Sequence, residues 1–186
     1  MSDAAWLLKS TDARDADGVY RTALIALKQG LAEQAVPLAR SAADLHPQDA
    51  RMWQVLALAY RGLDDLAPAL DAIERAAALA PHDALIAHTL ARTAFEAGLP
   101  SLHLFDPARR LAPEDNALLL NHVAAYWAEG ATDTAIALLD ERVIAQPGWL
   151  EGHVTLARLR WMSGARDAFT TSFDTALATA PQNVDL

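Results

Sequence analysis

The side chains that could do chemistry in this 186-residue chain are dispersed, and none of the familiar catalytic or metal-binding spacings is present. The six histidines form no His-x-x-x-His or His-x-Asp pair, and there is no cysteine to supply a thiolate ligand. The glycines do not cluster into a phosphate-binding loop, and no serine lies in a nucleophile-elbow pattern. We therefore expect no catalytic residue, no metal site and no cofactor, and no enzyme activity from this chain itself.

Composition limits the partners that the chain could have. The formal net charge is -9, which argues against nucleic acid and against an anionic membrane surface. No apolar run approaches the roughly 20 residues that a membrane-spanning helix needs. The first residues also lack a basic leader followed by a long apolar core. We accordingly expect a cytoplasmic protein with neither nucleic-acid nor membrane partners.

An internal repeat shows which elements must position any functional residue. Prolines recur at intervals of 34, 32, 34 and 34 residues, at Pro47, Pro81, Pro113, Pro147 and Pro181. Turn residues keep the same phase, at Gly30, Asp64, Gly98, Gly130 and Gly164. We assign repeats to 16–49, 50–83, 84–115, 116–149 and 150–183, preceded by a capping segment at 1–15 and followed by a tail at 184–186.

The clearest unit is 50–83, which predicts two short helices whose backbones approach closely. Bulky and small residues recur at three- and four-residue spacing in its first half, and small residues recur seven apart in its second half. The key positions are Trp53, Leu56, Ala57, Tyr60, Ala69, Ala76 and Pro81. In this order they resemble the tetratricopeptide repeat, whose unit is about 34 residues long. The resemblance implies an all-α fold, a right-handed α-solenoid of five helix-turn-helix repeats.

Two later repeats depart from this pattern. The second helix of the third repeat lacks two residues, counted back from Pro113, and contains Pro107. We expect that helix to be shortened. In the fourth repeat His122 replaces an apolar residue of the core, and we expect its side chain to be buried.

The resemblance also implies that the first helix of each repeat lines a concave groove. The residues that this phase places in the groove, and that we expect to bind a peptide, are Tyr20, Arg21, Arg51, Gln54, Arg61, His88, Arg92, Phe95, Asn121, Trp127, Arg158 and Trp161. The same phase includes Leu24, Leu27, Lys28, Leu58 and Glu96. Arginines beside aromatic anchors suit an acidic peptide or a terminal carboxylate. The alternative is that these side chains are solvated or pack between repeats.

The main functional hypothesis is a scaffold, part of a larger protein, that binds a protein or peptide segment in its groove. A second hypothesis rests on a further resemblance. The runs 149–153, 156–161 and 169–173 are similar to the final repeat of bacterial proteins whose repeat array precedes an iron/2-oxoglutarate oxygenase domain. This resemblance implies a substrate-recruiting role and gives no catalytic role to any residue of the chain.

A third hypothesis is a self-associating adaptor. The chain ends five residues after Pro181, without the polar cap that repeat arrays usually carry. Phe169, Phe173 and Leu177 would then be partly exposed. We expect the chain to continue into a longer protein; formation of a homo-oligomer through the uncapped repeat and tolerated exposure are the alternatives.

Overall fold

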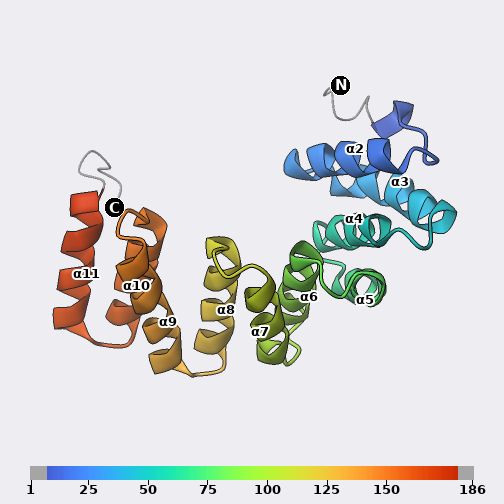
Figure 1. Ribbon diagram of the computed structural model, residues 1–186. Helices are drawn as coiled ribbons and strands as arrows, with labels where there is room; N and C mark the ends of the chain where they lie inside the picture. The colour runs from blue at the N-terminus through green and yellow to red at the C-terminus, as the bar shows by residue number, and fades with distance from the viewer. Residues whose placement is uncertain (1–7, 180–186) are drawn as a thin grey trace. The chain divides into compact units, whose positions relative to one another are not determined.

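The computed structural model describes residues 8–179, which contain helices and turns but no strand. Consecutive helices form five pairs (Figure 1). The pairs are α2 (Ala16–Lys28) with α3 (Ala32–Leu45), α4 (Ala50–Arg61) with α5 (Leu66–Leu79), α6 (Ala84–Glu96) with α7 (Leu102–Leu111), α8 (Asn116–Ala128) with α9 (Thr132–Ala145), and α10 (Leu150–Met162) with α11 (Arg166–Thr179). The prediction of an all-α solenoid is confirmed, whereas the repeat limits stay a prediction. Residues 1–7 of the predicted cap and the predicted tail at 184–186 lie outside the described residues.

Aspartates fix where the first helix of a pair begins. Asp15, Asp49, Asp83 and Asp115 are the N-cap residues of α2, α4, α6 and α8, and each carboxylate accepts a hydrogen bond from a backbone N–H of the first turn. Such a cap is worth about 1 kcal/mol, because it satisfies a helix donor that otherwise has no partner. The fifth pair differs, since Trp149 precedes α10 without a side-chain cap.

The turn inside each pair requires a left-handed residue. The backbone angle φ is 74° at Gly30, 69° at Gly98, 79° at Gly130 and 84° at Gly164, and Asp64 adopts 59° at the equivalent place. Glycine reaches this region without steric cost, whereas aspartate is one of the few other residues that tolerate it. The sequence-based choice of these five turn positions agrees with the backbone.

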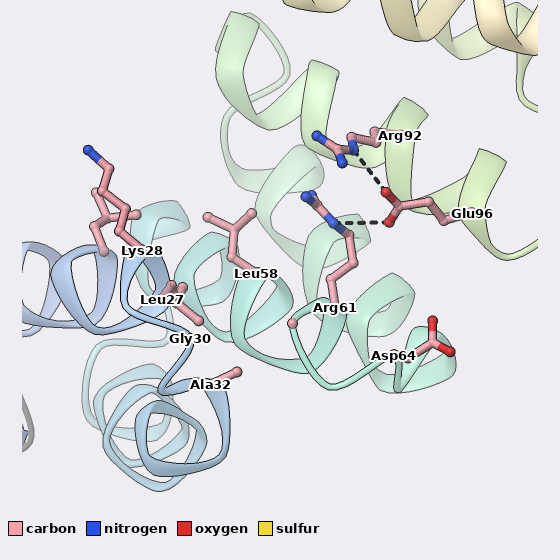
Figure 2. A pocket seen from close by; sticks show the side chains of 11 residues that line it. Leu27, Lys28, Gly30, Ala32, Leu58, Arg61, Asp64, Arg92 and Glu96 are labelled. Atoms are coloured by element: carbon pink, nitrogen blue, oxygen red, sulfur yellow. Dashed lines mark hydrogen bonds and ion pairs between the residues drawn. The ribbon is translucent and has the colours of Figure 1, made fainter.

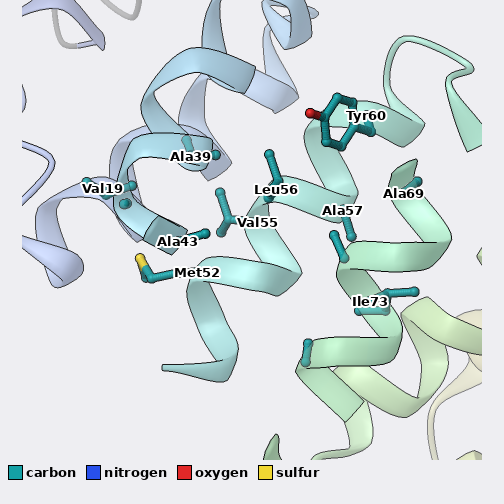
Figure 3. Packing of buried hydrophobic residues seen from close by; sticks show 14 of the residues in the cluster. Val19, Ala39, Ala43, Met52, Val55, Leu56, Ala57, Tyr60, Ala69 and Ile73 are labelled. Carbon is teal, nitrogen blue, oxygen red and sulfur yellow. The ribbon is translucent and has the colours of Figure 1, made fainter. Parts of the chain in front are cut away.

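The chain divides into two compact units, unit 1 (Met1–Glu114) and unit 2 (Asp115–Leu186). The core of unit 1 is dominated by small residues (Figure 3). Ala57, Ala69 and Ala76 are 0% exposed, so α4 and α5 lie close together, while Met52 and Ile73 fill the space beside them. Leu8 is also buried, against the first two helix pairs. The helices of unit 1 are thus packed mainly by close approach of alanine-bearing backbones, and less by interlocking of large side chains.

The irregular third pair is as short as the sequence predicts. Helix α7 has 10 residues and contains Pro107. Phe105 and Ala108 are its buried residues, and Phe105 is 0% exposed. One large aromatic ring therefore anchors a helix that has lost two residues of contact.

Unit 2 relies on leucines and on polar bridges. Leu119, Leu139 and Leu156 are at most 2% exposed and belong to one cluster. His122 is 1% exposed, as predicted, and its ring stacks on Tyr126 with centroids 4.5 Å apart.

Two arginines connect the helices of unit 2. Arg142, at a position where small residues are usual, donates from Nη1 to the Asn116 side chain at 2.9 Å. Arg160 of α10 donates to the carboxylate of Asp140 on α9 and to Ser172 Oγ on α11. A single guanidinium group therefore ties three helices together.

No helix within residues 8–179 is long and apolar enough to cross a membrane.

Candidate functional site

The first helices of unit 1 form one wall of a cleft of about 490 Å³, which we call the arginine cleft (Figure 2). Helix α4 contacts both α2 and α6, which brings the C-terminal turns of the three helices together. The lining residues are Leu24, Leu27, Lys28, Gly30, Ala32, Leu58, Arg61, Gly62, Asp64, Arg92 and Glu96.

The final residue of each of these helices lines the cleft, and Figure 2 shows the side chains of Arg61 and Glu96 pointing toward each other. These residues are Lys28 of α2, Arg61 of α4 and Glu96 of α6. A cation is favourable at a helix C-terminus, where the backbone dipole is negative, and an anion is not. The negative charge of Glu96 is therefore unfavourable at the end of α6 unless neighbouring cations compensate it.

Those cations are Arg61 and Arg92, which converge on the Glu96 carboxylate from two helices. Arg61 Nε lies 3.0 Å from Glu96 Oε2, and Arg92 Nε lies 2.8 Å from Glu96 Oε1. The Arg61 side chain is 19% exposed and that of Glu96 is 30% exposed. Each arginine is paired with Glu96 through its Nε, and no hydrogen bond from a terminal nitrogen of Arg61 or Arg92 is found within residues 8–179.

The cleft holds more positive than negative charge. Burial lowers the pKa of the Arg61 guanidinium; Glu96 opposes this effect and the nearby positive charge of Arg92 adds to it. One carboxylate, that of Glu96, is thus shared by two guanidinium groups. Lys28 is a third cation among the lining residues and Asp64 a second anion, so cations outnumber anions. An additional anion would relieve this excess.

Tyr20 and Arg51, two further predicted groove residues, lie together but outside the arginine cleft. Arg51 forms ion pairs with Asp17 at 2.6 Å and with Asp49 at 2.7 Å, and its guanidinium carbon is 5.9 Å from the Tyr20 ring centroid. Hydrogen bonds that Arg51 donates to Asp49 and Asp17 raise the pKa of Arg51, and the same contact with the Arg51 side chain lowers the pKa of Asp49. The charge of Arg51 is therefore already matched by two carboxylates of the chain.

The other predicted residues of unit 1 are not gathered at one place. Gln54 is 2% exposed, which corrects the expectation that it faces a bound peptide. Its helix is covered on both sides by α2 and α6, so the side that should face the groove is partly interior. Arg21 is exposed, whereas His88 and Phe95 are half-buried and do not line the arginine cleft.

Unit 2 carries a second concavity of about 420 Å³, which we call the aromatic pocket. It lies between α10 and α11, and Trp161 is 53% exposed beside it. The Trp161 and Phe169 rings meet edge to face at 5.1 Å, and the Phe169 and Phe173 rings stack at 5.6 Å. The lining residues are Val154, Ala157, Arg158, Trp161, Phe169 and Phe173.

Two predicted groove residues, Arg158 and Trp161, therefore meet in the aromatic pocket. Trp127 is half-buried against the core of unit 2, and Asn121 is half-buried outside the pocket. The sequence predicts that Phe169 and Phe173 are partly exposed, but it does not indicate that they line a pocket together with Trp161. Within residues 8–179 no three histidine, aspartate or glutamate side chains are grouped to hold a metal ion.

Solved structures with little sequence identity to this chain have the same fold. A thermophilic tetratricopeptide-repeat protein from Thermus thermophilus gives a TM-score of 0.71 at 22% identity, over 91% of this chain and 94% of that chain. YrrB, described as a tetratricopeptide-repeat protein with an unusual peptide-binding site, gives 0.68 at 16% identity, over 98% of this chain and 94% of that chain. The structure of the Cut9–Hcn1 hetero-tetramer of the APC/C gives 0.72 at 19% identity, over 93% of this chain and 35% of the matched chain.

No family model matches the sequence, and no curated protein matches it. The structural similarities concern the fold alone. They show that this chain has the tetratricopeptide-repeat fold, an all-α solenoid of paired helices.

Proposed function

We propose that this chain is a scaffold that binds a protein or peptide segment, and that the arginine cleft holds carboxylates of that segment. The convergence of Arg61 and Arg92 on one carboxylate carries the proposal. Because both guanidinium groups already approach the Glu96 carboxylate, a ligand carboxylate near them would have the same two partners. The fold supports the same reading, because YrrB is described as having a peptide-binding site and Cut9 as assembling with Hcn1.

The geometry favours an acidic ligand over a basic one. Charge-assisted hydrogen bonds from arginine to carboxylate are stronger than neutral ones. The terminal nitrogens of Arg61 and Arg92 are the donors that remain. A ligand carboxylate can use these donors beside Glu96 or displace Glu96 from them.

Apolar side chains give the cleft a second kind of contact. Leu24 and Leu27 of α2 and Leu58 of α4 line it next to the charged residues. An extended segment that alternates acidic and apolar residues would place both kinds of side chain against their partners. The ligand class is therefore a peptide with acidic and aliphatic residues close together.

Titration of a short fluorescent peptide of alternating leucine and glutamate tests this proposal. We expect Arg61→Ala with Arg92→Ala to weaken binding at least tenfold, which is about 1.4 kcal/mol. Arg21→Ala is the matched control, since Arg21 is an exposed arginine of unit 1 outside the cleft. A peptide with lysine in place of glutamate should not bind. Equal affinities for the double variant and the control would refute the proposal.

A further inference from the structure

We propose that the aromatic pocket is a second docking site, independent of the arginine cleft, for a peptide that inserts a bulky apolar side chain and places a carboxylate against Arg158. Its lining is apolar apart from this arginine. The occupant should therefore be anchored mainly by one bulky apolar side chain, whereas carboxylates are the main anchors of the ligand of the arginine cleft.

The first argument is exposed apolar surface. Trp161 is 53% exposed and Met162 is 57% exposed at the end of α10, and Val154 is 36% exposed about two helical turns before Trp161 on the same face. Isolated apolar residues on a surface are ordinary, but Trp161 and Val154 both line the aromatic pocket, and Met162 directly follows Trp161. A tryptophan at the edge of an apolar depression is the kind of residue that dominates binding energy at interfaces.

The second argument is that the pocket is preorganised without an occupant. The edge-to-face contact of Trp161 with Phe169 fixes one wall, and Arg166 lies over the Trp161 ring at 5.3 Å. On the neighbouring turn, Arg160 joins α10 to Asp140 of α9 and to Ser172 of α11. The two helices that form the pocket are thus held in place by groups that do not line it, which reduces the ordering cost of binding.

The third argument is charge. Arg158 lines the pocket, is exposed, and makes no ion pair with any residue in the described range 8–179. Arg160, two residues later, is by contrast matched by Asp140 at 2.6 Å. An arginine left without a counter-charge at the rim of an apolar pocket selects an acidic residue next to the apolar anchor.

The same charge argues against a second copy of the chain as the occupant. A symmetric dimer would present one patch to its own copy. Arg158 and Arg166 of the two copies would then meet across the contact, where like charges repel. A partner that carries carboxylates meets no such penalty.

Selection from a random peptide library displayed on phage, with the full chain as bait, tests the inference. We expect enriched peptides to share a bulky apolar residue with an aspartate or glutamate nearby. Their binding should fall at least tenfold with Trp161→Ser and should be unchanged by Arg61→Ala with Arg92→Ala. This independence separates failure of the second site from failure of the proposed function of the cleft.

Charge reversal supplies a variant that leaves the pocket walls intact. Arg158 is exposed, so Arg158→Glu should fold normally and should weaken an enriched acidic peptide about tenfold while strengthening its lysine counterpart. The inference is overturned if no peptide is enriched, or if the enriched peptides show no preference for acidic residues. Dimers in sedimentation that Trp161→Ser dissociates would instead make a second copy the occupant. Binding that is seen only after removal of residues 180–186 would make the chain's own end the occupant.

Discussion

The arginine cleft is lined by the ends of three first helices and the aromatic pocket by the two helices of one pair, and the two sites present opposite chemistry. The last residue of the first helix is Lys28 in α2, Arg61 in α4 and Glu96 in α6, whereas it is Met162 in α10. In unit 1 these ends are charged and partly neutralise one another. In unit 2 the corresponding end is apolar and exposed. The same helix-pair fold therefore supports two different surfaces through different side chains on its helices.

The comparison also separates aromatic rings that hold the fold from rings that are free to bind. Phe105 in α7 is 0% exposed, while Trp161 in α10 is 53% exposed. A ring of the first kind contributes to stability through burial, and a ring of the second kind contributes little until a ligand covers it.

The largest expected effect is on stability, and it tests directly whether the buried and the exposed aromatic rings have different roles. Phe105→Ala should lower the free energy of unfolding by about 3–5 kcal/mol, because it leaves a cavity in unit 1. Trp161→Ala should lower it by only about 0.5–1.5 kcal/mol, because about half of the indole is already exposed and the main loss is its edge-to-face contact with Phe169. Urea denaturation followed by circular dichroism measures both. A loss at Trp161 as large as that at Phe105 would mean that the aromatic pocket is part of the core of unit 2.

An intermediate effect sharpens the role of internal charge pairing in the cleft. Glu96→Gln should raise the affinity for the leucine–glutamate peptide by about tenfold, or 1.4 kcal/mol, because Glu96 competes with the ligand for Arg61 and Arg92. Glu33→Gln makes the same charge change at an exposed residue of α3 and is the matched control. Weaker binding of the Glu96 variant would show that Glu96 positions the arginines rather than competing for them.

The smallest effect concerns the turn at the rim of the cleft. Asp64→Gly should raise the free energy of unfolding by about 0.5–1 kcal/mol, because glycine relieves the left-handed backbone at φ 59°. Removal of the carboxylate should change peptide affinity by less than about twofold, since Asp64 is exposed to solvent. Thermal unfolding and the peptide titration report the two quantities. A large affinity change would make Asp64 a determinant of the cleft.

The fold was predictable because its signals are local. Prolines after the second helices and residues suited to left-handed turns each act within a few residues, so the sequence alone locates the repeats and their turns. The shortening of α7 likewise follows from counting residues before Pro113.

The candidate sites were predictable only in part, because they depend on which side chains meet across helices. Helical phase places Arg61 and Arg92 on the right side, and the four-residue spacing of Arg92 and Glu96 signals their pairing. It cannot show that Asp17, from the preceding repeat, engages Arg51. It also treats Gln54 as open surface, although α2 and α6 cover its helix on both sides.

The alanine-rich core of unit 1 affects how rigid the backbone around the arginine cleft is. Alanine has no side-chain rotamers to lose, so the close contact of α4 with its neighbours orders the backbone at little entropic cost. Such a core has few alternative packings, because alanine has no other side-chain rotamers to adopt. The ends of α2, α4 and α6 should therefore hold their spacing within a narrow range. The conformational freedom that remains in the cleft belongs mostly to the long side chains of Lys28, Arg61 and Arg92, and a ligand would have to restrict only those.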